Sequence, residues 1–223
     1  MVVLSQLREK NIRHVILSGG EPLLSPDLFS IIFLLQKNGF SISISTNAVR
    51  ATPIFCRKLK QTTVKKLTVN IAAICDNNGE IIQNYNSNSI INGIQNLTSS
   101  GFSVTLNNIL HKFTTKDILA QNIEYATRWG AKVISFTVPV CKSFSGCYEN
   151  DYFIDNKTVE KLRFFLEEIE QQMKPLIGIT LNCPKCFSNN CPANAEIFGV
   201  GWNKNLSTCL VKQYQVLPTL ETL

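Results

Sequence analysis

The chain has 223 residues, of which 44% are hydrophobic and 17% are charged, a balance that is typical of a globular protein and excludes a disordered one. A chain of this length forms one sizeable domain, or one domain with a small addition. The 22 basic and 16 acidic residues give a net charge of +6. The densest basic cluster, at residues 57–66, is interpreted as a solvated surface. A nucleic-acid interface is the less favoured alternative.

No apolar stretch has the length of a membrane-spanning helix. The longest candidate, residues 29–35, is too short and lies between Asp27 and Lys37. Charged residues from Arg8 onward interrupt the N-terminal apolar run, which argues against a signal peptide. These features predict a cytoplasmic protein with no membrane partner. In that compartment, eight cysteines favour metal or redox chemistry over disulfides.

A unit of apolar strand, turn and amphipathic helix recurs along most of the chain. Runs rich in Val, Ile, Thr or Phe predict strands at 14–18, 41–46, 66–72, 103–109 and 133–138. Helical periodicity and capping residues predict helices at 26–38, 88–100, 115–129 and 156–173. This alternation, at a spacing of roughly thirty residues, favours an α/β fold with parallel strands covered by helices.

Residues 1–10 resemble the end of a helix that another strand would precede. We therefore expect a partial (β/α)6 TIM-like barrel over residues 1–178, with its first strand missing. An open doubly wound sheet is the alternative, and both folds place an active site at the carboxyl ends of the strands. Residues 179–223, rich in Cys, Asn and turn residues, predict a small Cys-rich extension as a second module.

Small polar residues follow the predicted strands. After the first strand the chain reads Ser-Gly-Gly-Glu-Pro, at residues 18–22. Glycine permits a sharp turn and a close approach of a ligand to the backbone, and the Glu21 carboxylate can bind a charged amino-acid group. Taken alone, an ordinary strand-to-helix turn explains this motif equally well. The later strands end in Ser45-Thr46-Asn47, Asn70, Asn107-Asn108 and Thr137.

Together, these strand ends resemble the radical SAM family over roughly residues 1–175. In that family, a Gly-Gly-Glu-Pro strand end holds the methionine ammonium of S-adenosylmethionine. The Thr-Asn pair after the second strand resembles the family's own Thr-Asn strand end, and residues 101–108 resemble a later strand with asparagines near the ligand. The resemblance implies a set of residues that bind S-adenosylmethionine: Gly19, Gly20, Glu21, Thr46, Asn47 and Asn107.

The chain departs from the family pattern at the iron–sulfur cluster. Family members hold a [4Fe-4S] cluster through a C-x3-C-x2-C loop upstream of Gly-Gly-Glu, whereas no cysteine precedes Gly19 and no such run occurs in these residues. We therefore expect that the sequence lacks the ligands of the cluster that cleaves S-adenosylmethionine. An N-terminal truncation is the favoured explanation, and a degenerate relative is the alternative.

Four cysteines lie within twenty-seven residues near the C-terminus: Cys183, Cys186, Cys191 and Cys209. Such a thiolate set suits zinc or an iron–sulfur cluster, although buried structural cysteines are the simpler alternative. A hairpin predicted over residues 197–206 would return the last cysteine toward the third. The region resembles the SPASM or shorter twitch extension of radical SAM proteins. This implies an auxiliary [4Fe-4S] cluster, with zinc as the alternative. Cys141 and Cys147 are interpreted as ordinary loop cysteines, with extra metal ligands or substrate-facing thiols as the alternatives.

The resemblance implies an enzyme that cleaves S-adenosylmethionine reductively to a 5′-deoxyadenosyl radical, which takes hydrogen from a substrate. It also implies an electron donor and, by analogy with SPASM-like members, a peptide or protein substrate. The alternative is a catalytically degenerate binding protein with a four-cysteine metal site. A nucleic-acid protein is less favoured, because the second C-x2-C of a zinc ribbon is absent and aromatic residues do not interleave with the basic ones.

Overall fold

The computed structural model describes residues 2–71, 87–111, 113–138, 154–173, 176–182, 199–200, 205–207 and 216–219. Within them, six parallel strands form one sheet: β1 (His14–Leu17), β2 (Ser41–Thr46), β3 (Lys66–Ile71), β4 (Ser103–Ile109), β5 (Val133–Thr137) and β6 (Gly178–Asn182). The helices are α1 (Val2–Glu9), α2 (Leu28–Lys37), α3 (Pro53–Leu59), α4 (Ser87–Ser99), α5 (Lys116–Arg128) and α6 (Asn156–Met173).

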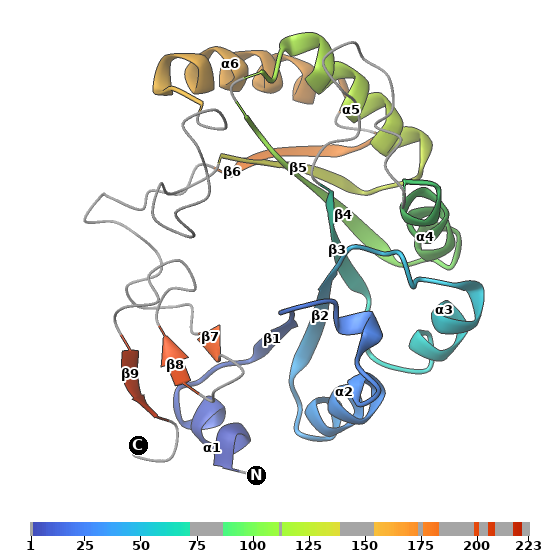
Figure 1. The fold of residues 1–223 in the computed structure, drawn as a ribbon, viewed down its shortest axis with the longest axis vertical. Helices are drawn as coiled ribbons and strands as arrows, with labels where there is room; N and C mark the ends of the chain where they lie inside the picture. The colour runs from blue at the N-terminus through green and yellow to red at the C-terminus, as the bar shows by residue number, and fades with distance from the viewer. Residues whose placement is uncertain are drawn as a thin grey trace.

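The strands are hydrogen-bonded in chain order from β1 to β6, and all five pairings are parallel. Figure 1 shows the sheet curving around an interior, with α2 to α6 on its outer side. β1 and β6 do not pair with each other, so the sheet is unclosed. This arrangement confirms the predicted α/β fold with a partial barrel of parallel strands, and it places all the carboxyl ends of the strands at one rim.

The two faces of the sheet differ in chemistry because side chains alternate along a strand. In β2, Ile42, Ile44 and Thr46 are buried and the serines between them are not. The buried face packs against the helices, with α2 on β2, α4 on β4, α5 on β5 and α6 on β6. The inner face carries mainly hydroxyl and amide side chains: Ser41, Ser43, Ser45, Thr68, Asn70, Ser103, Thr105, Asn107, Ser135, Thr137 and Thr180. A closed barrel fills this side with apolar residues.

Four described elements had no predicted range: η1 (Pro22–Leu24), α3, β6 and β9 (Val216–Thr219). α3 has seven residues, begins at Pro53, and is capped by the Thr52 hydroxyl, which accepts a hydrogen bond from the Phe55 N–H (3.2 Å). β6 lies at 178–182, so the predicted boundary at residue 178 falls at its start. The division into two modules remains a prediction.

A separate three-stranded antiparallel sheet contains β7 (Gly199–Val200), β8 (Asn205–Ser207) and β9 (Val216–Thr219). Gly199 pairs with Ser207 and Val200 with Leu206, so the hairpin predicted at 197–206 is confirmed at its paired residues. Among the described helices, none has the length and apolar character that crossing a membrane requires.

The alternation of faces predicts losses of stability of different size for substitutions at two adjacent residues of β2. Ile44 is fully buried, so Ile44→Ala should lower the free energy of unfolding by about 2–5 kcal/mol. Ser43 lies on the inner face with its hydroxyl 2.9 Å from His14 Nε2, so Ser43→Ala should cost about 1 kcal/mol or less. Urea denaturation measures both values, and equal losses would contradict this assignment of the faces.

Candidate functional site

The Glu21 carboxylate joins the end of β1 to the end of β2. Its Oε1 accepts a hydrogen bond from the Thr46 hydroxyl (2.5 Å) and another from the Leu23 N–H (3.0 Å), which caps the short 3-10 helix η1 (Pro22–Leu24). Its Oε2 accepts one from the Asn47 N–H (2.7 Å). A carboxylate offers about four acceptor positions, so three are used by these bonds and one remains on Oε2.

The two glycines before Glu21 leave the backbone accessible. Gly19 has φ +128°, a conformation that L side chains rarely adopt, so glycine is required for this turn. A Cβ atom built on Gly19 or on Gly20 meets no atom within 4 Å. The space beside both residues is therefore open, as a ligand that approaches the main chain next to Glu21 requires.

A ladder of hydrogen bonds crosses four strands on the inner face. The Thr137 hydroxyl donates to Asn107 Oδ1 (2.7 Å), and Asn107 Nδ2 donates to Asn70 Oδ1 (3.1 Å). Asn70 Nδ2 in turn donates to the Ser45 hydroxyl (2.6 Å). Each amide thus presents its oxygen to one neighbour and its nitrogen to the next, which fixes both amide groups in one orientation. The ladder gives the carboxyl-terminal rim a continuous polar lining.

The structure places the six predicted ligand-binding residues in two groups. Five of them come together at the ends of β1 and β2: Gly19, Gly20, Glu21, Thr46 and Asn47. Asn107 belongs instead to the inner-face ladder. The Asn47 side chain is exposed, and its Oδ1 accepts a hydrogen bond from the Val49 N–H (3.0 Å). Asn108, expected beside Asn107 at the rim, is 3% exposed and faces the helices, since neighbouring strand residues point to opposite faces.

The sequence identified the polar residues at the strand ends but not the hydrogen bonds and packing contacts between them. Asn70 and Thr137 were visible as polar strand residues, and the alternation of polar and apolar residues places them on the same face as Asn107. No such signal marks Ala48, whose N–H donates to the Thr46 hydroxyl (3.0 Å), or Gly93, which packs against Ala48. Their contact joins residues 45 positions apart in the chain and depends on how α4 packs on the turn after β2.

The predicted metal ligands Cys183, Cys186, Cys191 and Cys209 lie outside the described residues, as do Cys141 and Cys147. The part of the chain that the structure describes contains no group of three or more His, Cys, Asp or Glu residues that could hold a metal ion. Cys56, the cysteine that it does contain, is fully buried, and this burial raises the pKa of its thiol. A buried, protonated thiol is a poor metal ligand. The metal site therefore remains a prediction about the cysteines that lie outside the described residues.

Neither histidine contacts the Glu21 cluster. The two ring nitrogens of His14 lie 2.8 Å and 2.9 Å from the hydroxyls of Ser41 and Ser43, at the amino-terminal end of β1. His111 follows β4, and burial lowers the pKa of its imidazole below the usual value. Its Nδ1 accepts a hydrogen bond from the Phe113 N–H (3.2 Å), so the proton of the neutral ring is on Nε2.

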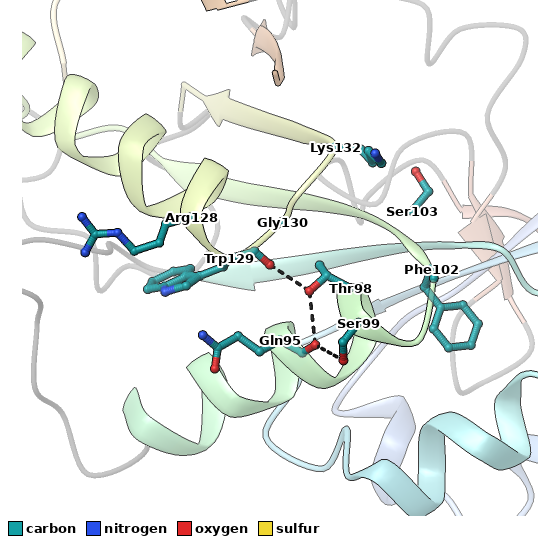
Figure 2. Close-up of a pocket in the computed structure, with 10 residues that line it drawn as sticks. Gln95, Thr98, Ser99, Phe102, Ser103, Arg128, Trp129, Gly130 and Lys132 are labelled. Atoms are coloured by element: carbon teal, nitrogen blue, oxygen red, sulfur yellow. Dashed lines mark hydrogen bonds between the residues drawn. The ribbon is translucent and has the colours of Figure 1, made fainter. Parts of the chain in front are cut away.

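The pocket in Figure 2 is distinct from this cluster. It has a volume of about 830 Å³ and is lined by residues from the ends of α4 and α5 and the starts of β4 and β5. The Thr98 hydroxyl donates a hydrogen bond to the Trp129 carbonyl oxygen (2.8 Å), and the Ser99 hydroxyl donates one to the Gln95 carbonyl oxygen (2.6 Å). Its position at the amino-terminal ends of the strands separates it from the rim that carries the predicted site.

The family model for the Radical SAM superfamily matches residues 3–126, more than half of the chain, and the chain therefore belongs to this superfamily. Members use S-adenosylmethionine and a [4Fe-4S] cluster. The chain is 30% identical over 132 residues to the AdoMet-dependent heme synthase of Methanosarcina barkeri, an alignment that covers 56% of this chain and 37% of the relative. It is 26% identical over 133 residues to the mycofactocin maturase MftC of Mycobacterium tuberculosis, covering 58% and 33%. The matched region thus spans about a third of the length of either relative.

Solved structures share the fold at low sequence identity. Streptococcus suis SuiB bound to its precursor peptide SuiA superposes with a TM-score of 0.76 at 12% identity, covering 94% of this chain and 52% of SuiB. The anSMEcpe structure with bound AdoMet superposes with a TM-score of 0.70 at 13% identity, covering 100% of this chain and 69% of that protein. These likenesses show the unclosed parallel α/β sheet of the family.

The ladder predicts a stability effect at Asn107. Asn107→Ala removes two hydrogen bonds and leaves the Thr137 hydroxyl and the Asn70 carbonyl oxygen without their partner, so the free energy of unfolding should fall by about 1–2 kcal/mol. Thr105→Ala, two residues earlier on the same face, is the control and should cost less. Chemical denaturation measures both variants, and a neutral Asn107→Ala would show that water replaces the ladder.

Proposed function

We propose that this chain binds S-adenosylmethionine at the ends of β1 and β2 and belongs to an enzyme that modifies a peptide or protein. The observation that carries the proposal is the Glu21 carboxylate, which is fixed by three hydrogen bonds and retains one acceptor position on Oε2. A charge-assisted hydrogen bond from the ligand's ammonium group would use this position. When bound next to a reduced [4Fe-4S] cluster, S-adenosylmethionine supplies a 5′-deoxyadenosyl radical that takes hydrogen from a substrate.

The residues of the rim fit the other parts of this ligand. Gly19 and Gly20 leave their backbone open on the side where a Cβ would project, which suits the amino-acid portion of the ligand. Asn107 lies on the inner face, and its amide is already oriented by Thr137 and Asn70. Its carbonyl oxygen keeps a second lone pair for a ligand hydroxyl or amine. The described residues do not supply cysteines for the cluster that cleaves the ligand, so no step through that cluster is assigned to them.

The C-terminal segment, residues 179–223, is proposed to hold an auxiliary [4Fe-4S] cluster through Cys183, Cys186, Cys191 and Cys209. The spacing of these thiols supports this proposal, and zinc is the alternative metal. The short antiparallel strands β7 and β8 lie between the third and fourth cysteines, as in the hairpin that would bring them together. An auxiliary cluster would serve to anchor the substrate or to pass electrons from a donor.

A peptide or protein substrate is proposed from the nature of the relatives. One curated relative is named a maturase, and SuiB was crystallised with its precursor peptide. A second candidate function is a binding protein that retains the rim and a metal site but performs no radical chemistry. These 223 residues contain no C-x3-C-x2-C run, so the two candidates are separated by the assay for 5′-deoxyadenosine.

Glu21→Gln tests the ligand site. The substitution removes the negative charge and places an amide NH2 against the donors of Thr46 or Asn47, so the affinity for S-adenosylmethionine should fall about tenfold or more. Isothermal titration calorimetry on anaerobically purified protein measures the affinity. Glu124→Gln is the matched control, because Glu124 is exposed on α5 and pairs only at the surface with Arg128 (2.7 Å).

Absence of binding by the unmodified chain, or equal binding by Glu21→Gln, would contradict the proposed site. Reconstitution with iron and sulfide, followed by an assay for 5′-deoxyadenosine, then separates the two candidate functions. Binding without this product favours the binding protein. Robust cleavage would show that the chain holds the required cluster through other ligands and would overturn the expectation that those ligands are missing.

A further inference from the structure

We infer that Thr46 is a positioning residue, which fixes the Glu21 carboxylate from the buried side and is itself fixed by helix α4. The inference rests on the proposed function, because it concerns the acceptor position that Glu21 offers to S-adenosylmethionine. It assigns to Thr46 a role through Glu21 in place of direct contact with the ligand. Three connected observations support it: the direction of one hydrogen bond, the conformation of Ala48, and the packing of Gly93.

The Thr46 hydroxyl has a defined direction. Its oxygen accepts a hydrogen bond from the Ala48 N–H (3.0 Å), and a backbone N–H can only donate. The hydroxyl proton is therefore free to point at Glu21 Oε1, 2.5 Å away, which is the short distance expected for a hydroxyl bound to a carboxylate. The Thr46 residue is 2% exposed and belongs to the helix-facing side of β2. This burial leaves Glu21 as the group through which Thr46 can act on a ligand.

Ala48 is held in an unusual conformation directly after this pair. Its φ of +62° lies in the left-handed region, which costs a residue with a Cβ roughly 1–2 kcal/mol, and it is fully buried. The turn that it starts is closed by the Ala51 N–H, which donates to the Ala48 carbonyl (2.9 Å). This conformation directs the Ala48 N–H at Thr46, so the orientation of the hydroxyl depends on the turn at residues 48–51.

Helix α4 supports both ends of that turn. A Cβ atom at Gly93 would overlap the Ala48 carbonyl group, so the helix backbone lies directly against it. Three residues later, Asn96 Nδ2 donates to the Ala51 carbonyl oxygen (3.0 Å). Residues three apart lie on one face of a helix, so one face of α4 contacts the first and the last residue of the turn. The connection runs from α4 through Ala48 and Thr46 to Glu21.

The consequence concerns the free acceptor position on Oε2. Oε1 is bonded to Thr46 and Leu23, and Oε2 is bonded to the Asn47 N–H. These bonds fix the carboxylate in one orientation about its terminal C–C bond. Loss of the Thr46 hydroxyl would leave Oε1 with one donor and allow the group to turn, which would misdirect the position left for the ammonium. The adenosine portion of the ligand does not depend on this position.

Calorimetry on the full chain with two probes tests the inference. Thr46→Val should raise the Kd for S-adenosylmethionine about tenfold and leave the Kd for 5′-methylthioadenosine, which lacks the amino-acid portion, within about twofold. Thr46→Ser, which keeps the hydroxyl, should restore the affinity to within about threefold. Thr62→Val is the matched control and should leave both affinities unchanged, because Thr62 is also buried, and its hydroxyl accepts from the Val64 N–H (3.2 Å) and donates to the Leu59 carbonyl (2.7 Å), away from the rim.

Each outcome has a defined meaning. If the role of Thr46 is purely structural, Thr46→Val will weaken the binding of both probes together, which would overturn the inference. Unchanged binding of S-adenosylmethionine by Thr46→Val would overturn it as well. If the unmodified chain binds 5′-methylthioadenosine and S-adenosylmethionine equally or binds neither, the proposed function fails instead. Should Thr46→Val not fold, Asn96→Ala removes the helix bond without adding bulk. Selective weakening of S-adenosylmethionine by Asn96→Ala would support the connection, and equal binding would overturn it.

Discussion

The hydrogen bond between the Thr46 hydroxyl and the Glu21 carboxylate is the interaction on which the candidate site depends. Glu21 lies on a turn after β1, where a glutamate side chain ordinarily samples several rotamers and loses their entropy when it is fixed. Here its two oxygens are bonded to β2 and to η1, so this entropy is lost on folding and not on binding. A preorganised acceptor binds a cationic group with less loss of freedom than a mobile one.

The same strand supplies both a buried support and an exposed surface because its residues alternate between two faces. Ser45 points to the inner face and joins the ladder to Asn70, whereas Thr46 points to the helices and bonds Glu21. A shift of one residue in the pairing of β2 would exchange these roles. The register of β2 with β1 and β3 therefore determines the chemistry of the rim, and the buried isoleucines of β2 stabilise that register.

Much of the fold could be predicted from the sequence, because β-branched runs and helix caps are local signals. The first five strands lie within one residue of the predicted ranges. α3 is too short for a helical period to be recognised, and β6 begins with Gly and ends with Asn, two residues that are depleted in strands. The polar residues of the site were also predictable, but their directions were not. Asn107 and Asn108 looked equivalent, although the register places only the first on the inner face.

The support for Glu21 comes from the neighbouring strand β2, from its own turn and, through the turn after β2, from α4. β2 pairs with β1 in parallel, so the end of β2 lies beside the end of β1. That end provides the Thr46 hydroxyl and the Asn47 N–H, and the turn after β1 adds the Leu23 N–H. Thr46 ends β2 and Asn47 follows it, and the next residue, Ala48, has a left-handed backbone conformation. That conformation persists only where close packing supports it. α4 provides this packing because position 93 has no side chain, and any residue larger than glycine there would displace the turn that orients the acceptor.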